Sequence, residues 1–373
     1  MKRTVVAAAA CLVASVACAQ SSVTLFGVVD AAVTYTTGSG PAYTSRWQLT
    51  NSANSFSRLG FRGNEDLGGG LSASFWLEEG LQNDTGTGFA SNTNNQLNGT
   101  LGAGTLTFNR RSTVSLSSST WGELRLGRDY TPTFWNTAIF DPFGTGGGIG
   151  ANQLYFSGLG GLAAPTGTRA SNSVGYFLPA NLGGFYGSVM YAAGENVSNS
   201  TLPPATPGAL PVSNKNDGNY GGVRLGYQSG PVHVSIATGL TTYATGDLRV
   251  SNLGASWTFE QLMGLRIMGE YYVESLGAVD GRGGLLGFSL PVGAGEIKAS
   301  YARYVRDPVG NVPNPTSSKL ALGYVYNFSK RTAVYATVAR LTNSNGASQA
   351  LGGVSTSPNH ASTGGESGMR VVF

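Results

Sequence analysis

Few residues of this chain have the types and spacing that acid–base or metal chemistry requires. Its two histidines are His233, which lies in an apolar segment between Val232 and Val234, and His360, which lies in a polar segment near the end. No serine or aspartate is tied to either histidine by a recognisable motif, so a hydrolase would lack its general base. No spacing of histidine and carboxylate residues specifies a metal site. We therefore predict that the chain has no catalytic residues and no metal ligands, and that the protein is not an enzyme.

A glycine-rich segment at residues 144–150 has some likeness to a phosphate-binding loop. It lacks the Lys-Ser/Thr pair that such a loop requires, and no helical pattern follows it. Flexibility and compact folding explain its composition better, so no cofactor is predicted. The chain has 23 basic and 19 acidic residues, without the basic cluster that nucleic-acid binding needs.

The first 19 residues have the three parts of a secretory signal peptide. Lys2 and Arg3 supply the positive start, residues 5–16 form the apolar core, and residues 17–19 form a small-residue cleavage site. We expect a signal peptide over residues 1–19 and one exported domain over residues 20–373. Cleavage would remove both cysteines, Cys11 and Cys18, and leave no thiol for a disulfide. Lipidation of Cys18 is a minor alternative.

The composition excludes most ordinary protein classes. Charged residues make up 11% of the chain, whereas soluble domains average about 25%. The hydrophobic fraction is 41%, and the mean hydropathy of −0.03 is too low for a bundle of membrane helices. A transmembrane barrel fits both facts, because its strands alternate lipid-facing apolar residues with lumen-facing polar ones.

Period-two alternation runs through the chain after residue 20. In residues 23–35, apolar side chains alternate with a set that includes Asp30. Residues 265–274 and 319–328 show the same pattern, and each run has about the ten residues that a tilted strand needs to cross a bilayer. Short turns such as 66–70 and 228–231 alternate with long polar stretches such as 82–104, 131–168 and 196–219. We predict an all-β fold, a transmembrane antiparallel barrel of about sixteen strands.

Several segments resemble the general, non-specific porins of Gram-negative bacteria, of the beta-proteobacterial type. Residues 20–30 are similar to that family's first strand, and residues 57–71 to its second strand and the following turn. Residues 121–132 and 169–176 resemble the strands that enter and leave its constriction loop, and the chain ends on Phe373 as the family usually does. The resemblance extends from end to end, with the long loops unmatched.

The resemblance implies a homotrimer of sixteen-stranded barrels in the outer membrane, with the third extracellular loop folded into the lumen. The expected function is passive diffusion of ions and small hydrophilic solutes through a water-filled channel. Expected contacts are outer-membrane lipid, lipopolysaccharide and the barrel-assembly machinery, for which Phe373 is part of the assembly signal.

The resemblance also implies where the pore is narrowest. Arg58, Arg169 and one of Arg110 and Arg111 would form a basic wall, and Arg110 is favoured because it stands six residues before Leu116. Since neighbours in a strand face opposite ways, Arg110 and Arg111 should not both face the lumen.

The acidic side of the pore would come from the loop at residues 131–168. Its one acid is Asp141, which could instead cap a turn before Pro142, and Asp129 just before the loop could serve as a second acid. This shortage of loop acids favours a weak anion preference.

Two other functions remain open on sequence alone. A substrate-specific channel would have a saturable site, for which an aromatic track could serve: Tyr130, Phe134, Trp135 and Tyr155. An adhesin or other interaction barrel would conduct little and act through its exposed loops.

Overall fold

The computed structural model describes residues 22–96, 107–144, 146–154, 165–202, 212–244, 246–310 and 312–373. The predicted signal peptide and Tyr155 lie outside these ranges. The main strands are β1 (Ser22–Thr37), β2 (Ser45–Asn51), β3 (Arg58–Gly68), β4 (Leu71–Gln82), β6 (Arg111–Ser118), β7 (Gly122–Tyr130), β8 (Arg169–Phe177), β9 (Phe185–Ala192), β12 (Tyr220–Ser229), β13 (Val232–Thr241), β14 (Leu248–Phe259), β15 (Leu265–Leu276), β16 (Val279–Val292), β17 (Gly295–Asp307), β18 (Thr316–Asn327), β19 (Thr332–Ser344) and β20 (Ser362–Val372). The shorter elements are β5 (Thr87–Gly88), β10 (Thr201–Leu202), β11 (Val212–Ser213), α2 (Pro132–Ile139), η2 (Pro165–Gly167), η3 (Glu260–Leu262) and η4 (Leu351–Gly353).

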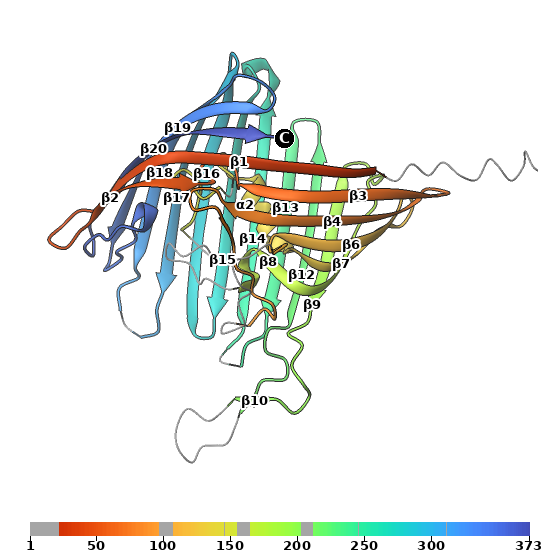
Figure 1. The fold of residues 1–373 in the computed structure, drawn as a ribbon. Helices are drawn as coiled ribbons and strands as arrows, with labels where there is room; N and C mark the ends of the chain where they lie inside the picture. Colours follow the sequence, from red (N-terminus) through yellow and green to blue (C-terminus); the bar gives the residue numbers. More distant parts are fainter. Residues whose placement is uncertain are drawn as a thin grey trace, which may run out of the picture.

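These strands form a closed antiparallel barrel (Figure 1). The barrel closes because the first strand pairs with the last, from Val28 opposite Val372 to Thr37 opposite Thr363. β2 and β3 pair with the two halves of β1 and share one place in the wall. The wall therefore has sixteen strands, which confirms the predicted fold.

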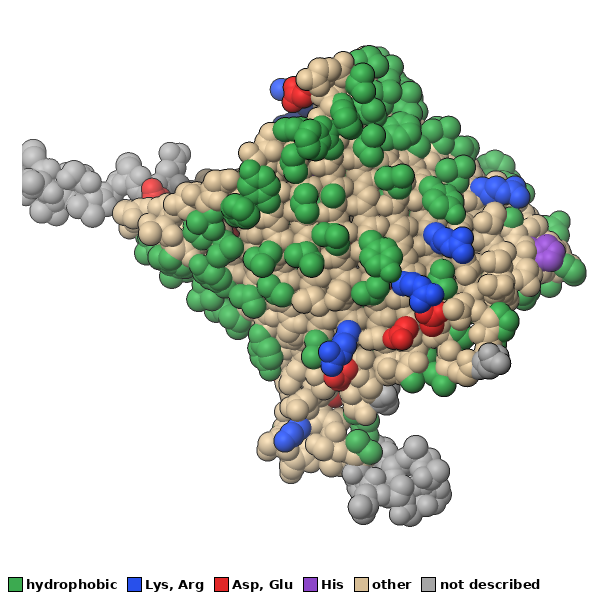
Figure 2. Space-filling view, turned by 180° about the vertical axis from the view of Figure 1, so that it is seen from behind, with side chains coloured by type: hydrophobic (Ala, Val, Ile, Leu, Met, Phe, Trp, Pro, Cys, Tyr) green, Lys and Arg blue, Asp and Glu red, His purple; other side chains and the backbone are tan. Residues whose placement is uncertain are grey.

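The alternating sequence sorts side chains between the two faces of the wall. In β15, Ile267, Tyr271 and Val273 are exposed on the outer face, while Glu270 and Tyr272 are buried on the inner one. Hydrophobic side chains are spread over the outer wall (Figure 2). An outer face of this kind is stable in lipid, and the strands satisfy their backbone polar groups through pairing with neighbours.

Short turns join the strands at one end of the barrel and longer loops join them at the other. The turn from β3 to β4 shows why short turns work here: Gly68, Gly69 and Gly70 all have positive φ, at 82°, 60° and 79°. Glycine adopts this conformation without a Cβ clash. No described helix is long and apolar enough to cross a membrane.

The described part of the long loop between β7 and β8 folds into the lumen instead of outward, as predicted. Its helix α2 lies along the inner wall, where the Asn136 amide donates to the Ser235 carbonyl at 3.2 Å and to Asn252 Oδ1 at 2.9 Å. Arg224 Nε of β12 donates to Asn136 Oδ1 at 2.7 Å. These polar contacts fix the helix to β12, β13 and β14.

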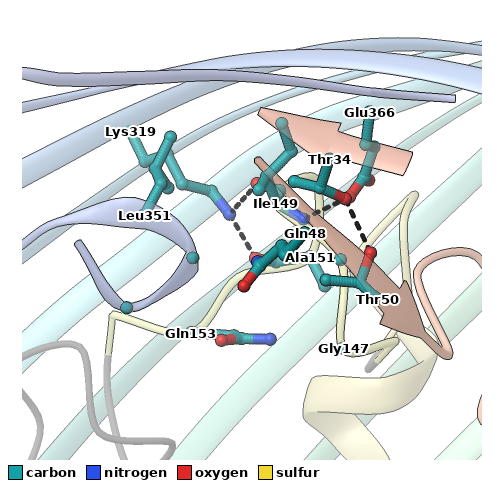
Figure 3. Close-up of a pocket in the computed structure, with 13 residues that line it drawn as sticks. Thr34, Gln48, Thr50, Gly147, Ile149, Ala151, Gln153, Lys319, Leu351 and Glu366 are labelled. Atoms are coloured by element: carbon teal, nitrogen blue, oxygen red, sulfur yellow. Dashed lines mark hydrogen bonds between the residues drawn. The ribbon is translucent and has the colours of Figure 1, made fainter. Parts of the chain in front are cut away.

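The far part of the same loop is attached to the opposite side of the lumen (Figure 3). Lys319 of β18 donates to the carbonyls of Ile149, at 2.8 Å, and Ala151. The Ile149 N–H donates to Glu366 Oε2 of β20 at 3.1 Å. The loop therefore crosses the barrel between two anchored ends and narrows the space beside it.

Candidate functional site

A cavity of about 530 Å³ lies between the inward loop and the wall formed by β1, β3, β4 and β6. The wall side carries four arginines, Arg58, Arg62, Arg110 and Arg111, together with the acid Glu78. The loop side is uncharged within the described residues and presents Phe134, Trp135, Ala138, Phe143, Gly144 and Gly146. One face of this narrow space is thus cationic and the other apolar.

Strand register brings the wall charges together. Arg58 of β3 lies opposite Gly80 of β4, and Glu78 of β4 lies opposite Arg111 of β6. Alternation puts Arg58, Gly60 and Arg62 on the inner face of β3. A Cβ on Gly60 would lie 2.3 Å from Phe26 Cζ, so this glycine makes room for the Phe26 ring on the inner wall.

Glu78 is the centre of an ion-pair cluster. Its Oε1 accepts a hydrogen bond from Arg110 Nε at 2.5 Å and lies 4.0 Å from Arg58 Nε. Trp76 Nε1 donates to the other carboxylate oxygen at 3.2 Å. The carboxylate holds Arg110 in place but neutralises only one of the four cations in the lining.

Tyr130, the last residue of β7, joins the remaining arginines. Its hydroxyl accepts from Arg110 Nη2 at 2.7 Å and from Arg169 Nη2 at 3.1 Å, and the Arg169 guanidinium lies 4.5 Å from its ring centroid. Arg58 donates to the Phe56 carbonyl at 3.0 Å, and Arg110 lies 4.9 Å from the Phe56 ring centroid. The structure therefore brings the three arginines chosen from the sequence into one cluster.

The expectation that only one of Arg110 and Arg111 faces the lumen is wrong. Both line the cavity. β6 begins at Arg111, so Arg110 precedes the strand and the alternation rule does not govern its side chain. Arg111 lies 4.6 Å from the Trp76 ring centroid and 3.6 Å from the carboxylate of Asp129.

Asp141 lies within the loop, and its carboxylate faces backbone N–H groups of the same loop. It accepts from the N–H of Phe143 at 2.9 Å and of Asn152 at 2.7 Å, and only 5% of the residue is exposed. Burial raises the pKa of Asp141 to about 6, against the opposing effect of these N–H groups and of Lys319. This geometry matches the alternative in which Asp141 caps a turn before Pro142.

Sequence reasoning missed Glu78 and Arg62. Both stand in alternating strands, where Trp76 and Glu78 take one face and Phe75 and Leu77 the other, so their inward position could have been inferred. The family resemblance implies acids on the loop, so it did not point to Glu78, which lies on the wall. Asp129 does face inward, but it pairs with Arg125 at 2.5 Å and with Arg111.

Both histidines contact neighbouring residues of the wall or the loops. Tyr186 shares a hydrogen bond with His233 Nε2 at 2.7 Å, and the Phe140 ring lies 5.0 Å from the imidazole. His360 contacts the Pro358 carbonyl at the outer loops. No cluster of three metal-ligating side chains occurs among the described residues.

Comparison with known proteins places this architecture. The sequence pattern of the Gram-negative porin family matches residues 5–346. Outer membrane porin protein 32 of Delftia acidovorans is 36% identical, with 100% of both chains covered. An outer membrane porin protein of Bordetella pertussis is 29% identical, covering 90% of this chain and 93% of the relative.

Solved structures agree. The anion-selective porin from Comamonas acidovorans superposes with a TM-score of 0.77 at 32% identity, over 95% of this chain and 100% of that one. OmpT of Vibrio cholerae, at 14% identity and a TM-score of 0.63 over 95% and 99% of the two chains, shares the fold. The chain therefore belongs to the Gram-negative porin family, and it is an outer-membrane porin that forms a general diffusion channel.

Proposed function

We propose that this porin prefers anions to cations and that Arg58, Arg110 and Arg169 set the preference at the constriction. The observation that carries the proposal is the cavity lining, in which a wall with four arginines and one glutamate faces an uncharged loop surface. Arg169 does not line this cavity itself, but it shares the Tyr130 hydroxyl with Arg110. Charges in salt water are screened over about 8–10 Å, so charges in the narrow section outweigh those on distant loops. A 32% identical neighbour is described as anion-selective, which supports the same preference here.

The test is the zero-current potential of single channels under a tenfold KCl gradient. Arg58→Glu reverses one charge at the constriction and should shift this potential toward cation preference. Lys215→Glu makes the same charge change on an exposed outer segment and should shift it much less. Equal shifts, or no shift in either variant, would place the selective region elsewhere.

Asp141 contributes to the constriction indirectly in this proposal. Its carboxylate holds the loop backbone at Phe143 and Asn152, and Phe143 lines the cavity. The loop face of the pore is thus shaped by an acid that does not present its charge to the solute.

We also propose that residues 1–19 are removed on export, so that the mature protein starts at Gln20 and assembles as a homotrimer. The sequence features of the leader and membership of the porin family support this. N-terminal sequencing and gel electrophoresis of unheated samples test it, and a monomeric band in every mild detergent would contradict the trimer.

Lipopolysaccharide is the proposed partner of the outer wall near the long loops. Four exposed arginines stand there on β14, β16, β17 and β19: Arg249, Arg282, Arg303 and Arg340. Figure 2 shows basic side chains in a row on this wall, with acidic side chains beside some of them. Guanidinium groups suit the phosphates of such a lipid. Replacing Arg303 and Arg340 by glutamine should lower the amount of lipopolysaccharide that copurifies, and an unchanged amount would refute this contact.

A further inference from the structure

We propose that the constriction is a weak binding site for aromatic carboxylates, which stay bound there longer than hydrophilic anions of similar charge. The inference rests on the proposed anion preference and names the solute class that the site favours. It follows from how differently the two faces of one cavity are built.

The loop face offers an aromatic surface. In helix α2, Asn136 and Thr137 bond to the barrel wall behind the helix, through Asn252 at 2.9 Å and Glu270 at 3.1 Å. The neighbouring Trp135 therefore turns to the cavity, where its ring is partly exposed. The ring packs on Tyr130 at 5.2 Å, and Tyr130 stacks on Phe134 at 5.1 Å with an interplanar angle of 11°.

The wall face offers guanidinium groups with donors to spare. Arg110 already uses Nε and Nη2 on Glu78 and Tyr130. Arg62 makes no ion pair with any described residue, and its guanidinium lies over the Trp76 and Phe26 rings at 5.2 and 5.4 Å from their centroids. The Arg58 side chain is 29% exposed and lies at 4.0 Å from its acid. Arg58 and Arg62 can thus take a carboxylate in paired, charge-assisted hydrogen bonds.

A solute that spans both faces needs a flat apolar part and an anionic end. The cavity volume of about 530 Å³ is within the usual range of small-molecule sites, roughly 300–1,000 Å³. An aromatic ring can stack on Trp135, and its carboxylate can reach the arginines. A small hydrophilic anion uses only the wall, so it gains nothing from the loop face. Stacking contributes about 0.5–1.5 kcal/mol, which is weak enough to let the solute leave.

The experiment measures interruption of single-channel KCl current by benzoate, cyclohexanecarboxylate and acetate at one pH where all three are ionised. Benzoate should halve the current at a concentration about 2- to 10-fold lower than cyclohexanecarboxylate, and acetate should be weakest. Trp135→Ala should remove the advantage of benzoate over cyclohexanecarboxylate, and Trp135→Phe should keep part of it. Trp121→Ala, in the short turn between β6 and β7, is the matched control and should keep all of it.

Equal block by benzoate and cyclohexanecarboxylate in the wild type overturns the inference, as does an unchanged benzoate advantage in Trp135→Ala. Arg58→Gln should weaken block by all three acids together. The zero-current potential of the same channels is recorded without any organic acid, so a failure of the anion preference shows independently of the block.

Discussion

At the scale of single residues, the selectivity of the channel depends on how completely its arginines are neutralised. Glu78 is the one acid among the described residues of the cavity lining, and it contacts Arg58 and Arg110. Its carboxylate lies in a confined space, where a fixed charge acts on passing ions more strongly than on an open surface. Removing that charge while keeping the side-chain shape isolates its effect.

Glu78→Gln should therefore increase anion preference. The amide oxygen can still accept from Arg110 Nε, so the arginine stays in place while the lining gains one net positive charge. Glu79→Gln is the matched control, because Glu79 is the next residue of β4, lies on its other face and is 4% exposed. The zero-current potential should move toward anions for Glu78→Gln and little for Glu79→Gln; similar shifts would show that Glu78 is not a pore charge.

At the scale of elements, the inward loop is positioned by polar groups at both ends of its path across the lumen. Lys319 is 2% exposed and donates to the carbonyls of Ile149 and Ala151. These carbonyls would lose a charged donor if the lysine were replaced by an apolar side chain. We expect this attachment to keep the size of the pore constant.

Lys319→Met should make the open current noisier, because the loop end around Ile149 would lose its attachment to β18. We expect brief partial closures at moderate voltage that are rare in the wild type. Lys298→Met serves as control, since Lys298 of β17 is partly exposed and pairs with Glu296 at 3.3 Å. A quiet Lys319→Met channel would mean that the rest of the loop packing is sufficient.

The acid of the loop should make stability depend on pH. The pKa of Asp141 is about 6 in the folded protein and 3.8 as its ordinary value, so folding favours the protonated form. The stabilising contribution is complete below pH about 4 and is lost as pH rises through about 6; it is on the order of 3 kcal/mol. Asp141→Asn cannot ionise and lacks this dependence.

The measurement is the temperature at which the unheated, folded band disappears on gels, at pH 4.5 and pH 7.5. From the lower to the higher pH, the wild type should lose more stability than Asp141→Asn. Parallel behaviour of the two proteins would show that Asp141 is ionised over the whole range, or that its environment is open to lumen water.

Elements were more predictable from the sequence than contacts. One face of a barrel wall contacts lipid and the other contacts water, so apolar and polar residues alternate along each strand. The runs at 265–274 and 319–328 could therefore be assigned to strands, and their apolar faces to the outside. The inward loop could be located only through the family resemblance. The sequence did not show where β6 begins, so it could not place both Arg110 and Arg111 in the pore. Nor could it show that the Asp141 carboxylate faces Asn152, because that depends on how the loop folds back.

At the scale of the whole molecule, the barrel is closed by contacts between its two ends. The pairing of β20 with β1 continues beyond Val372: Phe373 donates to the Gly27 carbonyl at 3.1 Å, and the Gly27 N–H donates to the Phe373 carbonyl at 3.0 Å. A Cβ on Gly27 would lie 2.3 Å from Phe373 Cζ, so the aromatic ring lies against this glycine. Phe373 is 45% exposed and stands at the short-turn end of the barrel.

This closure predicts that Phe373 acts in assembly. Deleting Phe373, or replacing it with glutamate, should lower the amount of folded porin in the outer membrane while the leader is still cleaved and the chain still reaches the periplasm. Phe373→Tyr should assemble normally, because the aromatic ring and the backbone bonds to Gly27 are kept. The measurement is the heat-modifiable band in outer-membrane fractions, compared with total exported protein.

Gly27→Val separates the two roles of the terminal residue: it displaces the ring from β1 but leaves Phe373 in the chain. If the machinery reads the free terminal aromatic, Gly27→Val should be delivered to the membrane yet fold into a less heat-stable barrel. Wild-type levels of folded porin in the deletion would refute the assembly role of Phe373.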